Sequence, residues 1–198
     1  MKTNNKILVL SIGSGALAAL NYIYSNKPEE IKADFVSIDT DKEILKNSNV
    51  KTMLIGRKLT KGAGAKGNPD IGVYSFYENE EAIIKKVNKY NTVFVISCLG
   101  GGTGSGASIA LIKLLKDLRL KVFCLTTIPF EFEKKKHKLP IDEITDKLKY
   151  YSDILSTIDN EVQLMLAQYD IINQKLLERF LDIYRKEIIQ GEENNVFN

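Results

Sequence analysis

The sequence contains no tryptophan, and its 198 residues include only two cysteines, one histidine and four prolines. Protein zinc sites are built mainly from cysteine and histidine, so this composition predicts no metal site of that kind. Cys98 and Cys124 lie within apolar, strand-like stretches, where a free cysteine behaves as a small hydrophobic residue. The formal net charge is only +3, which gives no reason to expect a nucleic acid as partner.

Long apolar runs are also missing. No run approaches the roughly 20 residues that a membrane-spanning helix needs, and the N-terminus carries no apolar signal segment. We therefore expect a cytoplasmic protein without a membrane segment. Hydrophobic residues make up 44% of the chain, enough for one sizeable core. We expect residues 1–190 to form one domain that ends in a long helix, and residues 191–198 to form a polar tail.

Apolar strand-like stretches alternate with helical patterns along the whole chain. Strands are predicted at 6–12, 33–38, 51–55, 93–98, 121–128 and 154–158, and helices at 14–24, 71–77, 78–88, 109–118, 141–151 and 171–189. This alternation is typical of an α/β fold, namely a Rossmann-like, mainly parallel sheet with helices on both faces. The loops that follow the strands then collect at one edge of the sheet, where such folds bind ligands.

The most informative stretch is 100–106, which reads GGGTGSG between a buried strand and an amphipathic helix. Glycine allows the backbone to adopt positive φ and to approach phosphate oxygens closely, while the following helix presents the positive end of its dipole. Thr103 and Ser105 add hydroxyl donors. We favour an anion site here over a purely structural turn, since a turn needs only one or two glycines.

A second strand–glycine–helix unit opens the chain. Residues 13–18 read GSGALA, and Asp39 follows the next strand, a pattern that also fits a dinucleotide fold with the acid on a ribose. The alternative is close packing of helix on strand. A third glycine-rich loop, at 56–72, is long enough to be functional or disordered, and we favour a loop that wraps a ligand. Its GxGxxG segment at 62–67 is not a dinucleotide motif, because no strand immediately precedes it and Pro69 follows.

Charge is concentrated at 130–138, FEFEKKKHK, which by default is a solvated face. Glu133 and His137 stand four residues apart and could share one side of a helix beside a ligand. His137 is otherwise a surface histidine.

At this point the chain resembles the tubulin/FtsZ family, whose signature loop GGGTG[ST]G is spelled in full by residues 100–106. Further stretches are similar in the same order, at 38–41 (IDTD), 60–72, 129–133 (PFEFE) and 158–161 (IDNE). The similarity covers almost the whole chain.

This resemblance implies a domain that binds GTP or GDP, with Mg²⁺ as its companion. Residues 100–106 would hold the phosphates, Glu133 and Asn160 would approach the ribose and base, and the last helix would offer Phe180 to the guanine ring. The nucleotide-binding residues implied are Gly13, Ser14, Gly15, Asp39, Asp41, Gly64, Ala65, Gly100, Gly101, Gly102, Thr103, Gly104, Ser105, Gly106, Pro129, Glu133, His137, Asn160 and Phe180.

The chain also departs from the family pattern. Residues 16–19 read ALAA where more glycine and an asparagine are usual, and His137 stands where arginine is usual. In the family an acidic or amide residue that binds guanine is expected at the position of Tyr184 and Arg185. Its absence predicts that discrimination between guanine and other bases is weaker by about 1–3 kcal/mol. Family members continue into an aspartate-bearing activation loop and a second domain, and this sequence has no aspartate after Asp182.

Three functional hypotheses follow. The leading one is a nucleotide-binding module that associates with itself or with filament-forming relatives and has weak or no GTPase activity on its own, because phosphoryl transfer needs positioned charges. The second is a non-catalytic regulator or scaffold of filaments with a vestigial nucleotide site. The third, an NAD-type oxidoreductase suggested by residues 13–18 and Asp39, leaves the richer glycine loop unexplained.

Overall fold

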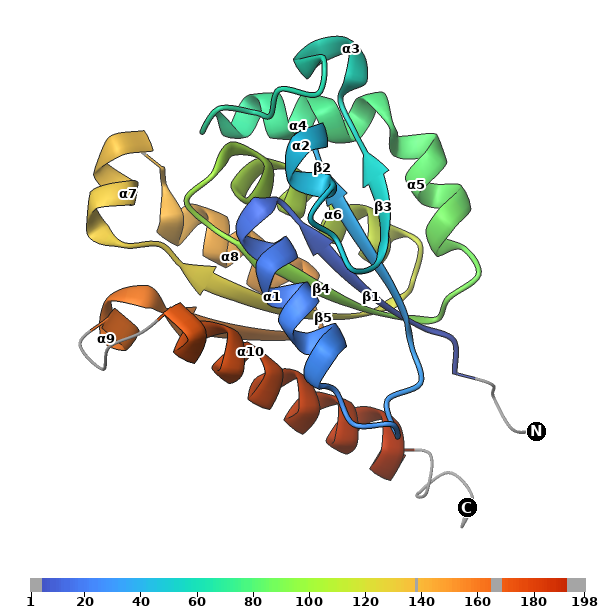
Figure 1. Ribbon diagram of the computed structural model, residues 1–198. Coiled ribbons are helices and arrows are strands. Elements are labelled where there is room, and N and C mark those ends of the chain that lie inside the picture. Colours follow the sequence, from blue (N-terminus) through green and yellow to red (C-terminus); the bar gives the residue numbers. More distant parts are fainter. Residues whose placement is uncertain (1–4, 138, 165–168, 192–198) are drawn as a thin grey trace.

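The computed structural model describes residues 5–137, 139–164 and 169–191. Within these residues a single sheet of six parallel strands runs in the order β3-β2-β1-β4-β5-β6 (Figure 1). The strands are β1 (Ile7–Ile12), β2 (Asp34–Asp39), β3 (Lys51–Leu54), β4 (Thr92–Cys98), β5 (Lys121–Ile128) and β6 (Ile154–Asp159).

Helices cover both faces of the sheet (Figure 1). One face packs against α1 (Ser14–Asn26) and α10 (Tyr169–Tyr184), which continues into the π-helix η2 (Arg185–Ile189). The other face packs against α4 (Pro69–Glu78), α5 (Glu80–Val87), α6 (Ser108–Asp117) and α8 (Ile141–Tyr151). Shorter elements lie at the ends of the strands: α2 (Lys42–Leu45), α3 (Arg57–Thr60), the π-helix η1 (Thr103–Ala107), α7 (Glu131–His137) and α9 (Asn160–Leu164).

The central strand β4 shows why these residues form a three-layer structure. Val93 and Val95 pack into the core under α6 and α8, whereas Phe94 and Ile96 pack into the core under α1 and α10. All four side chains are fully buried. A strand covered on both faces requires such an uninterrupted apolar run, since successive side chains point to opposite faces.

The structure confirms the predicted fold class and the six strands, with boundaries that differ by at most one residue. The sequence analysis did not predict α2, α3 or α9, because helices of four or five residues are too short to show a period. In the described part of the chain, no helix is both long and apolar enough to cross a membrane.

Candidate functional site

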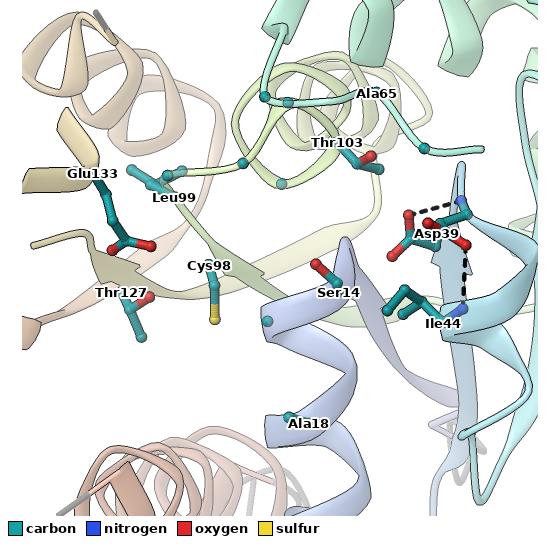
Figure 2. Close-up of a pocket in the computed structure, with 18 of the residues that line it drawn as sticks. Ser14, Ala18, Asp39, Ile44, Ala65, Cys98, Leu99, Thr103, Thr127 and Glu133 are labelled. Carbon is teal, nitrogen blue, oxygen red and sulfur yellow. Dashed lines mark hydrogen bonds between the residues drawn. The ribbon is translucent and has the colours of Figure 1, made fainter. Parts of the chain in front are cut away.

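The carboxyl ends of the parallel strands meet at one edge of the sheet and surround a cavity of about 750 Å³ (Figure 2). Loops that are far apart in sequence form its wall, as expected for this class of sheet. The predicted residues that line the cavity are Ser14, Gly15, Asp39, Asp41, Gly64, Ala65, Gly100, Gly101, Gly102, Thr103, Gly104, Glu133 and Asn160.

The glycines of the loop after β4 have two different roles. A Cβ atom added to Gly104 would collide with the carbonyl oxygen of Cys98, and one added to Gly106 would collide with that of Pro69. By contrast, a Cβ atom on Gly101 would meet no atom of the described part of the chain within 4 Å. Gly104 and Gly106 therefore serve close packing, while Gly101 leaves open space at the cavity.

Two hydrogen bonds shape the turn of this loop. Gly100, with φ of 121°, donates its N–H to Oγ of Ser105 over 3.2 Å, and Ser105 donates its own N–H to the carbonyl of Gly101 over 3.1 Å. Ser105 is fully buried, so it holds the loop from behind and does not line the cavity. Gly106 is likewise buried behind the loop.

The backbone N–H groups of residues 101–104 have no hydrogen-bond acceptor among the described residues. The first turn of α1 is similar, because its N-cap residue Gly13 provides no side-chain cap, and Ser14 and Gly15 of that turn line the cavity. Unpaired N–H groups at a helix N-terminus bind anions readily, with support from the helix dipole. Two such groups of donors therefore border one cavity.

The close approach of Gly13 to Gly104 brings these two groups together. A Cβ atom at Gly13, whose φ is 91°, would lie 2.8 Å from the backbone nitrogen of Gly104. Any larger residue would push the two loops apart. Gly13 thus belongs to the packed wall of the cavity. Pro129 belongs to this wall as well, because a Cβ atom added to Gly100 would lie 3.0 Å from Cβ of Pro129.

The third glycine-rich loop closes the cavity from another side. Gly64 donates its N–H to the carbonyl of Thr40 over 3.2 Å, and Ala63 forms an isolated bridge with Asp41. Residues 63–67 line the cavity, and Lys66 adds a cationic side chain that the sequence analysis had not singled out. The loop is described throughout and lines a cavity, which supports the ligand-wrapping interpretation over disorder.

Asp39 is a buried carboxyl group in this wall, only 2% exposed. Its Oδ1 accepts the N–H groups of Thr40 and Asp41 at 2.6 and 3.1 Å, while Oδ2 has no hydrogen-bond partner among the described residues. Burial raises the pKa of Asp39 to about 6, against the lowering effect of those two hydrogen bonds. With this pKa the group is mostly ionised at pH 7 and becomes mostly neutral only below about pH 6, where its repulsion of an anion is lost.

The far end of the cavity has a different character. Phe130 and Phe132 stack with ring centroids 5.5 Å apart, and Glu133 Oε2 accepts the N–H of Phe130 over 3.1 Å. Asn160 is 8% exposed, and its Oδ1 has no partner within the described residues. Aromatic rings and unpaired amide groups suit a flat, polar heterocycle, so this end fits a base and ribose better than it fits phosphates.

Asn173 is a second amide at this end, and the sequence analysis missed it. Asn173 and Ile172 line the cavity from the first turns of α10. An asparagine within a helical pattern looks like a solvent-facing residue, so nothing in the sequence distinguished it. Only the packing of α10 across the sheet brings its first turns to the cavity.

Phe180 does not reach the cavity, and this corrects the sequence analysis. Its ring is fully buried in the core, 5.0 Å from the ring of Phe94 and 5.7 Å from that of Tyr184. Seven residues separate it from Asn173, roughly 10 Å along a helix. Tyr184 is also remote from the cavity, since its hydroxyl bonds to the backbone of Lys32, so the departure noted at that position does not bear on a base. The last predicted residue, His137, ends α7, and its side chain lies outside the described residues.

Comparisons with known proteins agree with this geometry. The model of the "Tubulin/FtsZ family, GTPase domain" matches residues 3–168. The cell division protein FtsZ of Buchnera aphidicola is 32% identical over 91% of this chain and 46% of its own length. The FtsZ of Pseudomonas putida is 33% identical over 83% of this chain and 41% of its own length. The chain thus spans about half the length of the curated relatives it matches.

Solved structures show the same fold. An empty FtsZ dimer from M. jannaschii superposes with a TM-score of 0.80 and 29% identity, over 89% of this chain and 53% of that chain. CetZ2 of Haloferax volcanii, described as a GTPgS-bound protofilament, gives a TM-score of 0.80 with 21% identity. The match covers 92% of this chain and 59% of that chain.

Proposed function

This chain belongs to the tubulin/FtsZ family, and from that premise we propose that it binds GTP or GDP in the cavity at the carboxyl edge of its sheet. One observation carries the proposal: two sets of unpaired backbone N–H groups, one from residues 101–104 and one from the first turn of α1, border the same cavity. A di- or triphosphate satisfies several such donors at once.

In this arrangement the phosphates lie over Gly101 and against the N-terminus of α1, with the positive charge of Lys66 on the cavity wall. The base lies at the opposite end, where Asn160 and Asn173 offer amide groups to its edge and Phe132 offers an apolar surface. Glu133 lies at this same end, beside Phe130, and is suited to accept hydrogen bonds from ribose hydroxyl groups.

Magnesium fits this site only as a companion of the nucleotide. Among the described residues, no group of three or more histidine, cysteine, aspartate or glutamate side chains could hold a metal ion. Asp39 and Asp41 supply carboxylates beside the phosphate end, and Mg²⁺ typically combines one or two carboxylates with phosphate oxygens and water. When bound, the ion would neutralise phosphate charge.

We expect little GTP hydrolysis from the 198-residue chain alone. Among the described residues, three acidic side chains line the cavity, and each uses one carboxylate oxygen to accept backbone N–H groups: Asp39 from Thr40 and Asp41, Asp41 from Glu43 and Ile44, and Glu133 from Phe130. These contacts hold the carboxyl groups against the wall, and we propose that none of them orients an attacking water molecule, a role that phosphoryl transfer requires. We further propose that the chain acts by associating with itself or with filament-forming relatives.

The test is to identify the bound nucleotide. The protein is purified without added nucleotide. Heat denaturation then releases whatever nucleotide is bound, and the supernatant is analysed by mass spectrometry. We expect GDP or GTP, and calorimetry of the emptied protein should show binding of GDP and GTP but far weaker binding of ATP and NAD⁺. An absence of guanine nucleotide binding at micromolar concentrations would leave the scaffold hypothesis in its place, and NAD⁺ as the preferred ligand would revive the oxidoreductase.

A further inference from the structure

The strand β6 is an open edge of the sheet. Among the described residues it pairs only with β5, and its six residues, ILSTID, include no proline, lysine or bulge. The opposite edge strand, β3, is shorter at four residues and begins with an exposed lysine, Lys51. Natural proteins usually protect sheet edges with such devices, because an open edge is a template for pairing with another chain. The edge at β6 lacks them.

The register shows which backbone groups β6 leaves open. Leu99 donates its N–H to the carbonyl of Thr127, so Thr127 faces β4, and its neighbours in β5, Thr126 and Ile128, face β6. In a parallel ladder these residues bond to positions 156 and 158 of β6, because N–H and C=O groups alternate between the two sides of a strand. The N–H and C=O groups of Leu155 and Thr157 therefore point away from the sheet.

A hollow of about 450 Å³ lies beside this edge, between β6 and α10. Thr157 and Val162 line it, and both are exposed, Val162 at 55%. Four charged residues of α10 line the same hollow: Lys175, Glu178, Arg179 and Asp182. In the described part of the chain none of these four forms an ion pair, although Glu178 accepts a hydrogen bond from Gln174.

The order of the four charges along α10 is positive, negative, positive, negative. Read in the opposite direction, the same row is negative, positive, negative, positive. A two-fold rotation that sets α10 antiparallel to a second copy of itself therefore brings Lys175 opposite Asp182 and Glu178 opposite Arg179. Such a row is complementary to itself, as the single patch of an isologous interface must be.

We propose that β6 and α10 form a two-fold interface between two copies of this chain, with β6 paired antiparallel to the β6 of the other copy about an axis near Thr157. The strand pairing satisfies the open N–H and C=O groups of Leu155 and Thr157, and Val162 becomes buried. The ion pairs across α10 are exposed and add little affinity, but they fix the antiparallel orientation and exclude other partners. This surface is separate from the nucleotide cavity, and the inference goes beyond the proposed function.

The charge row allows a sharp test by sedimentation equilibrium of the full 198-residue chain at increasing concentration, without nucleotide and with excess GDP. We expect a monomer–dimer equilibrium in both conditions. The variants Lys175→Glu/Arg179→Glu and Glu178→Lys/Asp182→Lys each carry four like charges, so each should dimerise at least about tenfold more weakly. Mixed in equal amounts, they should form a heterodimer with affinity close to that of the unmodified chain.

The strand pairing is tested by proline. Thr157→Pro removes an N–H that points away from β5, so the fold tolerates it while strand addition is blocked. The matched control is Thr52→Pro on β3, which is also exposed. Its N–H also points outward: Ile55, three residues further on, donates to the carbonyl of Asp39 in β2, and successive residues of a strand face opposite sides. We expect loss of the dimer for Thr157→Pro alone, with unchanged circular dichroism and GDP affinity in both variants.

A monomer at all concentrations, or a failure of the mixed charge variants to associate, would overturn the proposal. An equal loss of dimer affinity in Thr157→Pro and Thr52→Pro would overturn it as well. A dimer that forms only with nucleotide would place the contact at the cavity edge instead. None of these outcomes depends on which nucleotide the cavity binds, so the interface and the proposed function can fail separately.

Discussion

The hydroxyl groups of Thr40 and Thr103 lie 2.7 Å apart, and both residues are buried. This hydrogen bond joins the loop that follows β2 to Thr103, the first residue of η1, so two loops that line the cavity are tied together at its wall. Either hydroxyl can be the donor.

We therefore expect Thr103→Val to lower the free energy of unfolding by about 1–3 kcal/mol, because the hydroxyl of Thr40 remains buried without this partner. Urea denaturation monitored by circular dichroism measures the change. The double variant Thr40→Val/Thr103→Val should cost clearly less than the sum of the two single variants, since it leaves neither hydroxyl behind. Strict additivity would show that the two groups do not interact.

Asp39 predicts a pH dependence of stability. Burial raises its pKa to about 6 from the ordinary value of 3.8, so between these pH values the folded state holds a proton that the unfolded state has lost. This contribution is fully present below about pH 4 and disappears as the pH rises through 6. It corresponds to about 3 kcal/mol, at roughly 1.4 kcal/mol per pH unit.

The measurement compares Asp39→Asn with the unmodified chain at pH 4.5 and at pH 7.5. The asparagine variant carries no titrating group at this position, so its stability relative to the unmodified chain should rise with pH. A difference that stays constant over this range would show that Asp39 titrates at an ordinary pKa. In the absence of Mg²⁺, the affinity of the unmodified chain for GDP should also fall as the pH rises through 6, because ionised Asp39 repels phosphate.

The sequence identified the fold and the phosphate end of the site because both are local signals. Residues 92–118 spell a buried strand, a glycine loop and an amphipathic helix in continuous order. The base end depends instead on where α10 crosses the sheet. The apolar period of this helix showed that Phe180 is a good core residue, but not which turn of the helix reaches the cavity. That depends on the connection from β6 to α10, which carries no periodic pattern.

The glycines of the loop after β4 predict two different mutant phenotypes. Gly101→Val should reduce GDP affinity at least about tenfold without changing thermal stability, because its side chain meets open space in the protein and occupies the cavity. Gly191→Val is the matched control, since a Cβ atom there also meets no atom of the described residues within 4 Å and Gly191 does not line the cavity. Gly104→Ala should instead lower stability by about 1–3 kcal/mol, because its methyl group collides with the carbonyl of Cys98. Equal melting temperatures for Gly101→Val and Gly104→Ala would contradict this division.

The two cysteines should be unreactive in the folded protein. Burial raises the pKa of Cys98 to about 11 and that of Cys124 to about 12, so almost no thiolate exists at pH 8. Labelling with iodoacetamide at pH 8, followed by intact mass spectrometry, should show no modification of the native chain and two modifications in urea. Cys98 lines the cavity and Cys124 does not, so fast labelling of Cys98 alone would indicate that solvent reaches this part of the cavity.

Asn173 and Phe180 lie on the same helix but should affect different properties when each is replaced by alanine. Asn173→Ala removes an amide at the base end of the cavity, so it should weaken GDP binding by a factor of about 10–100 and reduce the preference for guanine over adenine nucleotides, with little change in melting temperature.

Phe180→Ala empties a fully buried position beside Phe94 and should lower the free energy of unfolding by about 3–5 kcal/mol. At a temperature where this variant stays folded, its preference for guanine should be unchanged, because the ring does not face the ligand. A loss of base preference in Phe180→Ala, with none in Asn173→Ala, would return the base-binding role to the aromatic ring and would mean that α10 lies differently against the sheet when nucleotide is bound.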